Sequence, residues 1–314
     1  MEFSDVKTSY IEGEEFVRPT ALANGTIDVS DLVTYDVDMS VGTHVVTGTY
    51  KDVSNTFEIT VSPDSGEAET PDIPTDDISE KFSVKNKATS EAIEAVDGVY
   101  TITEIGEYDI SGKLEEGQIV VNVPEPESLE EGEEDVVVLN LNETSISSTS
   151  GCPIHVIECR DVEISAKKGK NNYLYDHSSL KDETNDPYGA AIYVENGDLK
   201  LKGTGKLLCV SSNNNGIHGK DDVKIQKMNL MVKATNNGIK GNDSISIKEG
   251  AIIDIECGDD GLKTSNNSYS SKGKQKGNIE IIDGNITINS WADGIDAEYD
   301  VIIADTVTVV DEET

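Results

Sequence analysis

The chain has 314 residues, which is enough for two domains, and a formal net charge of −36. This acidic excess argues against nucleic acid as a partner, and the absence of any apolar run of 18 residues argues against membrane insertion. Aromatic residues make up only 5% of the chain while glycine is frequent, with 27 residues, a composition that favours a β-solenoid over an α/β enzyme.

The charge is spread unevenly. Residues 160–280 hold 18 Lys and Arg against 17 Asp and Glu, whereas the rest of the chain holds 7 against 44. The general explanation of such acidity is solubility. The sharper hypothesis is that the near-neutral, Lys-rich middle meets an acidic ligand.

The N-terminal residues 1–62 alternate apolar and polar side chains in short runs, which predicts a small β domain. The expected strands are Phe16–Pro19, Thr26–Val29, Val33–Val37, Gly42–Tyr50 and Thr56–Val61. The opening Tyr10-Ile11-Glu12-Gly13-Glu14-Glu15-Phe16, the run Val41–Tyr50 and the last strand Thr56-Phe57-Glu58-Ile59-Thr60-Val61 resemble bacterial immunoglobulin-like domains. The resemblance implies a β-sandwich that acts as a spacer. No signal peptide precedes it, which suggests a trimmed, mature N-terminus instead of the native start.

Residues 63–79 are rich in Pro, Asp, Glu, Ser and Thr and are expected to form an extended linker. Residues 80–314 then form the second predicted domain. Its first strands are expected at Val99–Thr103, Ile110–Leu114, Ile119–Val123, Val136–Leu141, Ile154–Ile157, Val162–Ile164, Ile192–Val194 and Leu199–Leu201. Two polar excursions interrupt them, an acidic loop at Glu125–Asp135 and a longer loop at Asn171–Pro187.

A unit built around a glycine recurs four times near the C-terminus. The units are Asn214-Asn215-Gly216-Ile217, Asn236-Asn237-Gly238-Ile239, Asp259-Asp260-Gly261-Leu262 and Ala292-Asp293-Gly294-Ile295. The glycines are 22, 23 and 33 residues apart, and a polar insert at 265–277 accounts for the longest spacing. Such a period predicts stacked coils, because one coil cannot bury its apolar face alone.

Each unit holds two clear strands and a brief third around the Gly-Ile pair, which predicts one coil of a parallel β-helix. The inward residues before the glycines are expected to be Leu208 and Val210, Leu230 and Val232, Ile253 and Ile255, and Ile286 and Ile288. In this register Cys257 faces the core and Cys209 points outward. The glycines are expected at corners that need positive φ. The pattern does not decide whether Cys152 and Cys159 pair, and none of the four cysteines has zinc-site spacing.

From about Ala95 onward the chain resembles the bacterial carbohydrate-binding β-helix family first known from a clostridial cellulose- and pectin-binding protein. The residues that carry the resemblance include Thr101–Gly112, Gly117–Val121, Ala190–Tyr193, Gly203–Gly205, Asn215–Ile225, Asp259–Lys263 and Ala292–Ala297. It implies an all-β, right-handed parallel β-helix with the shape of a pectate lyase, secretion, bound calcium, and binding of plant cell-wall polysaccharide without an established catalytic role.

One column of equivalent positions changes from amides to carboxylates along the repeats: Asn215, Asn237, Asp260 and Asp293. Together with Asp259 and Asp296 these acids would repel one another unless a cation lay between them. Calcium prefers such oxygen ligands, so a Ca²⁺ site is expected at Asp259, Asp260, Asp293, Asp296 and Asn237, with its carboxylates drawn from two successive coils. The alternative is a corner ladder whose acids point to water.

Further candidates flank this column. Asp221 and Asp243 form a second acidic column, which is either another metal site or a pair of solvated turn residues. Lys220, Lys240, Lys263 and Trp291 are the predicted ligand-binding residues, and Lys200, Lys202, Lys224 and Lys233 are expected at outward strand positions. The other aromatic side chains that could stack on a sugar are Tyr173, Tyr175, Tyr188, Tyr193 and Tyr269.

The prediction is therefore an extracellular or cell-surface, non-catalytic protein that binds an acidic or cellulosic polysaccharide with the help of calcium. Two alternatives stay open. A pectate lyase would need a base of lowered pKa, such as Lys263 or Lys240, and a structural stalk or adhesin would bind no saccharide. An uncapped last coil would leave a strand edge open, so the chain is expected to continue or associate at its C-terminal end.

Overall fold

The computed structural model describes residues 2–4, 6–11, 16–24, 26–40, 42–62, 78–79, 81–124, 136–179, 189–304 and 308–311. The chain divides into two compact units, Met1–Pro71 and Asp72–Thr314. In the described part, regular structure is β-strand apart from one 3-10 turn at Ser30–Leu32, which confirms the all-β prediction. No helix there is long and apolar enough to span a bilayer. The expected linker residues 63–77, the acidic loop 125–135 and Tyr188 lie outside the described residues.

The first unit contains two small sheets. One has the order β1-β3-β4 and the other β2-β7-β6-β5. Their strands are β1 (Glu2–Ser4), β2 (Ser9–Ile11), β3 (Thr20–Ala23), β4 (Ile27–Asp28), β5 (Thr34–Asp36), β6 (Gly42–Tyr50) and β7 (Val53–Ser62). The strand expected at Phe16–Pro19 is absent. Pro19 has no N–H to donate to a ladder, and Phe16 instead packs its ring 5.3 Å from that of Tyr35.

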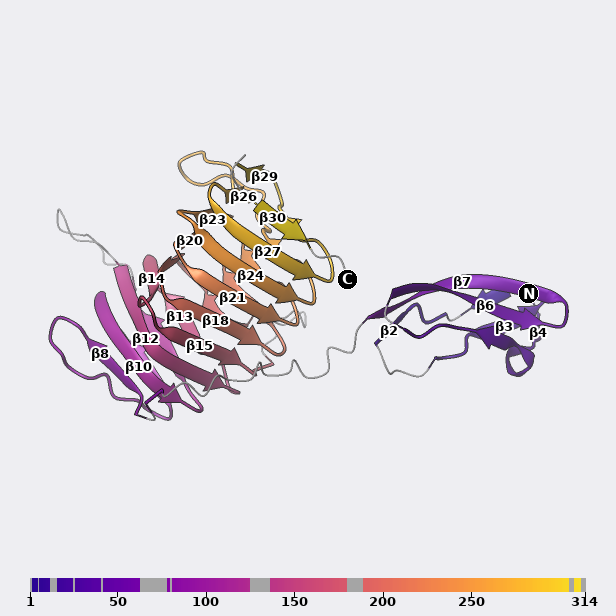
Figure 1. The fold of residues 1–314 in the computed structure, drawn as a ribbon, viewed down its shortest axis with the longest axis horizontal. Coiled ribbons are helices and arrows are strands. Elements are labelled where there is room, and N and C mark those ends of the chain that lie inside the picture. The colour runs from indigo at the N-terminus through magenta and orange to yellow at the C-terminus, as the bar shows by residue number, and fades with distance from the viewer. Residues whose placement is uncertain are drawn as a thin grey trace. The chain divides into compact units, whose positions relative to one another are not determined.

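The second unit is a stack of parallel strands in three columns (Figure 1). The short column comprises β9 (Val99–Ile102), β11 (Gln118–Asn122), β13 (Ile154–Glu158), β16 (Ala190–Val194), β19 (Asn215–Gly219), β22 (Ile239–Gly241), β25 (Leu262–Lys263) and β28 (Ile295–Asp296). The first long column comprises β14 (Asp161–Ala166), β17 (Asp198–Gly203), β20 (Asp222–Gln226), β23 (Ser244–Lys248), β26 (Asn278–Ile281) and β29 (Asp300–Ile303). The second long column comprises β15 (Asn171–Asp176), β18 (Lys206–Ser211), β21 (Asn229–Ala234), β24 (Ala251–Cys257), β27 (Gly284–Ser290) and β30 (Thr308–Asp311).

The two long columns belong to one sheet because β12 (Val136–Ser148) is long enough to pair with both β14 and β15. Beside it lies β10 (Gly106–Leu114), which pairs in turn with the antiparallel β8 (Ser83–Asn86). Each later coil then gives one strand to each column, so equivalent residues of successive coils lie side by side.

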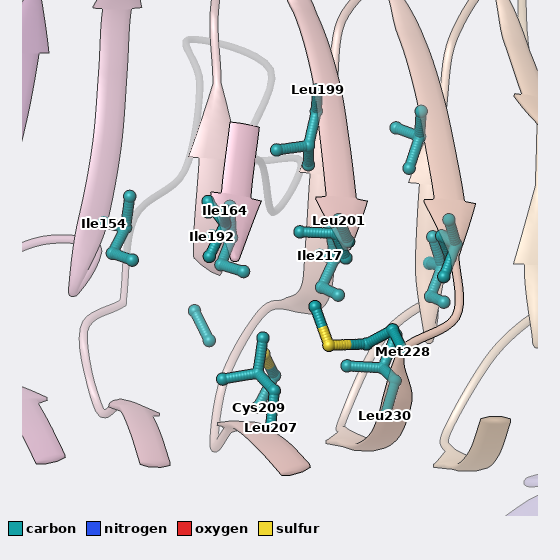
Figure 2. Packing of buried hydrophobic residues seen from close by; sticks show 14 of the residues in the cluster. Ile154, Ile164, Ile192, Leu199, Leu201, Leu207, Cys209, Ile217, Met228 and Leu230 are labelled. Carbon is teal, nitrogen blue, oxygen red and sulfur yellow. The ribbon is translucent and has the colours of Figure 1, made fainter. Parts of the chain in front are cut away.

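Alternating side chains of the three columns meet in one continuous core of aliphatic residues (Figure 2). Ile245 and Ile247 from the first long column and Ile255 from the second are fully buried. Burial of each such side chain stabilises the fold by roughly 1.5–3 kcal/mol. Because each residue packs against the coils above and below it, the stability belongs to the stack and not to a single coil.

The first repeat differs from the predicted register by one residue. Leu207 and Cys209 face the main core, whereas Leu208 and Val210 pack on the other side of β18 with Tyr173. The prediction that Cys209 points outward was therefore wrong. The turn from Ser211 to Gly216 holds one more residue than the turn from Ala234 to Gly238, so alignment on the glycines displaces β18. Cys257 does face the core, and all four cysteines are buried thiols.

The loop expected at Asn171–Pro187 begins instead with β15. Its polar sequence concealed a strand in which Asn172 is buried, accepts a hydrogen bond from the Thr144 N–H at 3.1 Å and donates one to the Lys206 carbonyl at 3.0 Å. A buried amide with partners on both neighbouring coils is stable within a strand, so composition misled the prediction.

The repeat glycines are required because the neighbouring coil leaves no room for a Cβ atom, and not because the backbone is left-handed. Gly216, Gly238 and Gly261 have no positive φ. A Cβ at Gly238 would overlap the Ile255 side chain and come within 2.7 Å of the Gly261 carbonyl oxygen. The expected reason for these glycines was wrong: they let successive coils approach closely where the chain enters the short column.

Candidate functional site

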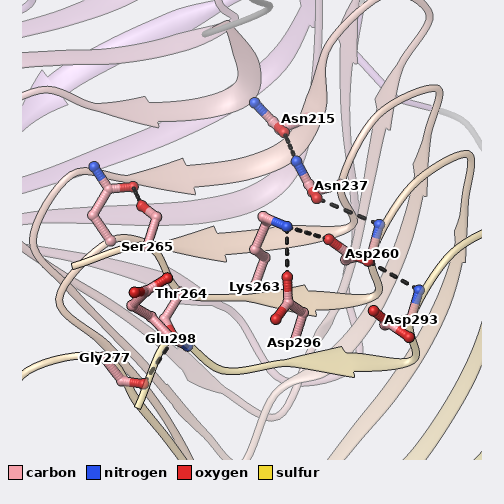
Figure 3. Close-up of polar contacts among 11 residues, drawn as sticks. Asn215, Asn237, Asp260, Lys263, Thr264, Ser265, Gly277, Asp293, Asp296 and Glu298 are labelled. Carbon is pink, nitrogen blue, oxygen red and sulfur yellow. Dashed lines mark hydrogen bonds and ion pairs between the residues drawn. The ribbon is translucent and has the colours of Figure 1, made fainter. Parts of the chain in front are cut away.

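A ladder of side chains runs along the corner where the chain enters the last four strands of the short column, β19, β22, β25 and β28 (Figure 3). The Asn237 amide donates to Asn215 Oδ1 at 2.9 Å, and Asn237 Oδ1 accepts from the Asp260 N–H at 3.4 Å. Asp260 Oδ1 in turn accepts from the Asp293 N–H at 2.9 Å. The four residues therefore stack in the order that the repeat implied, and Asn237 and Asp260 are buried.

Carboxylates converge at the C-terminal end of this ladder, which we call the acidic corner (Asp259, Asp260, Asp293 and Asp296). Asp260, Asp293 and Asp296 each offer an oxygen, and these oxygens lie within 4.8 Å of one another. Lys263 lies between two of them: its Nζ forms an ion pair with Asp260 Oδ2 and another, of 2.6 Å, with Asp296 Oδ2. A side-chain ammonium thus already supplies positive charge to the corner (Figure 3).

The electrostatics of the corner follow from this arrangement. Burial and the neighbouring Asp260 raise the pKa of Asp259 above its usual value. Burial alone would lower the pKa of Lys263, but its hydrogen bonds to Asp260 and Asp296 raise that pKa well above the ordinary value. Lys263 is therefore held in its charged form, which makes it a poor general base.

Lys240 and Lys263 belong to a row of side chains that runs from coil to coil on the outer face of the short strand column. Cross-strand pairing places His155, Tyr193, His218, Lys240 and Lys263 in sequence, one residue from each coil. The sequence prediction missed His155 and His218, although each member of the row is the residue after the inward Ile or Leu of its strand. That position was a usable signal.

The exposed part of the outer face is cationic and the covered part is aromatic. Tyr193 is only 1% exposed, packed 5.4 Å from the His155 ring and 5.3 Å from the His218 ring. The exposed Lys220 places its Nζ 5.7 Å from the centre of the Tyr193 ring. Tyr173 and Tyr175 are also buried, so three of the aromatic residues that could have stacked on a sugar are packing residues.

Trp291 remains available to a ligand. It lies in the turn that enters β28, half exposed, and its backbone N–H donates to the Cys257 carbonyl at 3.1 Å. The next residue, Ala292, donates to the Asp259 carbonyl at 3.3 Å. Trp291 therefore lies in the chain next to the acidic corner, and its half-exposed indole offers an aromatic face on which a sugar ring can stack.

Asp221 and Asp243 lie at the opposite end of the short strands, apart from the acidic corner. The Asp243 N–H donates to the Asp221 carbonyl at 3.3 Å, so the two positions stack as predicted. Asp221 accepts from the Gly197 N–H at 2.9 Å and borders a polar cavity of about 470 Å³. Burial is the main cause of a raised pKa at Asp221, with Asp243 and Asp198 contributing. Asp243 forms an ion pair with Lys276.

The outward lysines of the long columns have acidic partners one coil away. Lys200 and Lys202 both pair with Glu163, Lys224 lies 2.7 Å from Asp198, and Lys233 lies 2.6 Å from Glu256. These lysines hold coils together, and they lie on other columns than Lys240 and Lys263.

The donor set of the acidic corner fits a hard cation. Three carboxylates with mutually close oxygens match the oxygen ligands of calcium, and a divalent charge would offset their repulsion. The Lys263 ammonium lies between two of the same oxygens, so its contacts to Asp260 and Asp296 and the metal contacts are alternatives.

Comparison with known proteins gives consistent matches. The family described as carbohydrate-binding domain-containing protein matches residues 96–314. A carbohydrate-binding domain-containing protein of Acetivibrio thermocellus is 33% identical over 133 residues, which cover 42% of this chain and 43% of that protein, less than half of its length. A solved structure described as the polysaccharide lyase-like protein from C. thermocellum, gadolinium derivative, is 32% identical with a TM-score of 0.55, and the match covers 71% of this chain and 91% of that one. Because the family match extends over well more than half of the chain, this protein belongs to the carbohydrate-binding domain-containing family.

Proposed function

We propose that this chain is an extracellular, calcium-binding and non-catalytic protein that binds plant cell-wall polysaccharide. The observation that carries the proposal is that Lys240, Lys263 and the half-exposed Trp291 lie beside the acidic corner on neighbouring coils. Lysine ammonium groups and an exposed aromatic side chain near one corner suit a sugar chain that bears carboxylates. Polygalacturonate is therefore favoured over cellulose, which has no charge for the lysines to recognise.

Calcium is the proposed cofactor. Asp260, Asp293 and Asp296 would hold it, with Asp259 and Asn237 beside them. The ion would supply positive charge that can bridge protein carboxylates to a uronate carboxylate. Lys240 and Lys263 would add contacts to neighbouring uronates along the chain of sugars.

The finer fold assignment supports this function. We infer that the second unit is a right-handed parallel β-helix with a pectate-lyase-like shape, for which the three parallel columns are the support. We infer an immunoglobulin-like spacer for the first unit, from its two small and mostly antiparallel sheets. A solenoid presents equivalent residues at a spacing of about 4.8 Å, which suits a repeating polymer.

Titration calorimetry of polygalacturonate into the protein, in calcium and again in chelator, tests the proposal. We expect a saturable heat in calcium that is lost or strongly reduced in chelator. A neutral cellulose oligosaccharide is the matched ligand control. Absence of heat from polygalacturonate in both buffers would contradict the proposal and leave a neutral glycan or a structural stalk to be tested.

The competing function is a polysaccharide lyase, which the description of the structural neighbour suggests. A lyase needs a base whose pKa lies near the working pH, whereas the pKa of Lys263 is raised by its two carboxylate partners. We therefore expect no growth in the ultraviolet absorbance of an unsaturated uronate product during prolonged incubation with polygalacturonate. A steady increase in this absorbance would contradict the non-catalytic function and support a lyase.

A further inference from the structure

One coil carries a long insert at residues 265–277, here called the insert arm. The arm is a hydrogen-bonded hairpin, in which the Ser270 N–H donates to the Lys274 carbonyl at 2.8 Å and the Lys276 N–H donates to the Ser268 carbonyl at 2.9 Å. Tyr269 and Gln275 form an antiparallel bridge between its two legs. The arm therefore has a defined backbone of its own.

A single buried carboxylate holds both legs of the arm. Asp243 is 7% exposed; its Oδ1 accepts from the Asn266 amide at 2.5 Å on the first leg, and its Oδ2 pairs with Lys276 on the second. The Asp243 carbonyl also accepts from the Gly277 N–H at 2.6 Å. With each oxygen committed to the arm, Asp243 acts as an anchor, a role that its expected place in a metal site did not include.

The base of the arm lies next to the proposed binding face. The Ser265 and Asn266 N–H groups donate to the Asn242 carbonyl at 3.2 and 2.9 Å. Asn242 is two residues beyond Lys240, and Ser265 is two residues beyond Lys263. The chain segments that follow Lys240 and Lys263 thus lead directly into the attachment points of the arm, and Figure 3 shows Lys263 and Ser265.

The tip of the arm carries chemistry that its own packing does not use. Tyr269 is 69% exposed, and Lys272 and Lys274 are exposed. Within the described part of the chain neither lysine has an ion-pair partner, unlike Lys200, Lys202 and Lys224 on the long columns. Two free cations next to an exposed aromatic ring, in a chain of net charge −36, form a local surface for an anionic sugar polymer.

We propose that the insert arm is a second contact surface for the acidic polysaccharide, with Asp243 as its positioning residue. The inference rests on the proposed function and adds a specific region to it. The polymer would run along the outer face past Lys240 and Lys263 and meet Tyr269, Lys272 and Lys274 at one side. Because the anchored base limits the freedom of the arm, little conformational entropy is lost when the polymer binds.

The test compares three proteins by calorimetry with polygalacturonate in calcium: the parent, Lys272→Ala/Lys274→Ala, and Lys167→Ala/Lys168→Ala. The control removes the same charge from exposed lysines in the turn after β14. We expect the arm variant to bind about fivefold more weakly, from two exposed charge contacts, with a shallower salt dependence, and the control to stay within about twofold of the parent. Equal affinities of the two variants would overturn the inference while the proposed function stands. No binding by the parent would overturn both.

Asp243→Asn tests the positioning role. The amide keeps an acceptor for Asn266 but loses the ion pair with Lys276, so we expect weaker binding with the tip lysines present. In the Lys272→Ala/Lys274→Ala background the same change should cause a much smaller loss, because only the Tyr269 contact still depends on the position of the arm. An equal loss in both backgrounds would show a general structural effect and contradict the positioning role.

Discussion

At the scale of single residues, the acidic corner shows how a buried carboxylate is made tolerable. Asp260 is only 3% exposed, and an unpaired charge there would strongly destabilise the fold. Lys263 and the Asp293 N–H each satisfy one of its oxygens. The same contacts mean that a metal ion and the ammonium would compete for Asp260.

This competition predicts that Lys263→Met increases calcium affinity. Removal of the ammonium frees Asp260 and Asp296, and we expect about tenfold tighter binding, equivalent to about 1.4 kcal/mol, when calcium is titrated without glycan. In chelator the variant should unfold at lower temperature than the parent, because the corner then lacks its counter-charge. Lys233→Met, which removes a lysine paired with Glu256 on another column, is the control and should leave calcium affinity unchanged. Unchanged or weaker calcium binding by Lys263→Met would refute the competition.

The corner acids themselves give a second prediction. Asp260→Ala and Asp293→Ala should each weaken calcium uptake by about tenfold or more, since each removes one of three close carboxylates. Asp254→Ala, at an exposed position of β24, is the matched control. Parent-like calcium binding in both corner variants would show that the site has been assigned to the wrong residues.

At the scale of elements, the repeat glycines predict a sharp sensitivity to one methyl group. Gly238→Ala would force a Cβ against Ile255 and the Gly261 carbonyl. Overpacking of this kind costs about 1–3 kcal/mol, so we expect a lower midpoint in denaturant with an unchanged slope. Ser246→Ala, at an outward position of β23, should have little effect. A Gly238→Ala protein as stable as the parent would mean that the coils separate easily.

The sequence pattern identified most of the elements for a physical reason. Period-2 alternation follows directly from a strand with one buried face, and the glycine spacing reports the length of one coil. The sequence pattern gave the wrong structure where one extra turn residue or one buried polar residue broke the alternation. One extra residue between Ser211 and Gly216 moved Cys209 to the wrong side, and the buried amide of Asn172 made β15 look like a loop.

The candidate site was predicted less completely because its contacts cross coils. The stacking of Asn237, Asp260 and Asp293 follows from the repeat alone. The choice of Lys263 as partner of Asp296, 33 residues away, depends on side-chain geometry that spacing does not encode. The anchoring of the insert arm by Asp243 depends on an insert that the other three glycine-centred units do not contain, so the repeat did not predict it.

At the scale of the whole molecule, partly buried carboxylates in several coils link stability to pH. Burial raises the pKa of Asp221 and of Asp259, so the folded state binds protons at these groups more readily than the unfolded chain does. Their ionisation therefore opposes folding, and this effect grows as pH rises from their unfolded pKa through the raised folded value. Glu163 is the opposite case: burial would raise its pKa, but Lys200 and Lys202 lower it.

We therefore expect Asp221→Asn to raise the unfolding temperature at about pH 7.5, in chelator and low salt, with the gain disappearing below about pH 4. Glu163→Gln should show the reverse, a loss of stability at neutral pH that disappears in acid as Glu163 itself becomes protonated. Thermal unfolding followed by circular dichroism across this range measures both. Parallel pH profiles for the two variants would contradict the opposite signs assigned to these carboxylates.

The two-legged hold of Asp243 has a consequence for engineering. The Asp243 carboxylate binds Asn266 near the start of the insert and Lys276 near its end. The residues between these two points form a hairpin that could be replaced without a change to the residues that hold it. A foreign peptide that keeps Asn266 and Lys276 at its ends would be held at the same position by Asp243. The solenoid could then serve as a scaffold whose binding specificity is changed by replacing the insert arm alone.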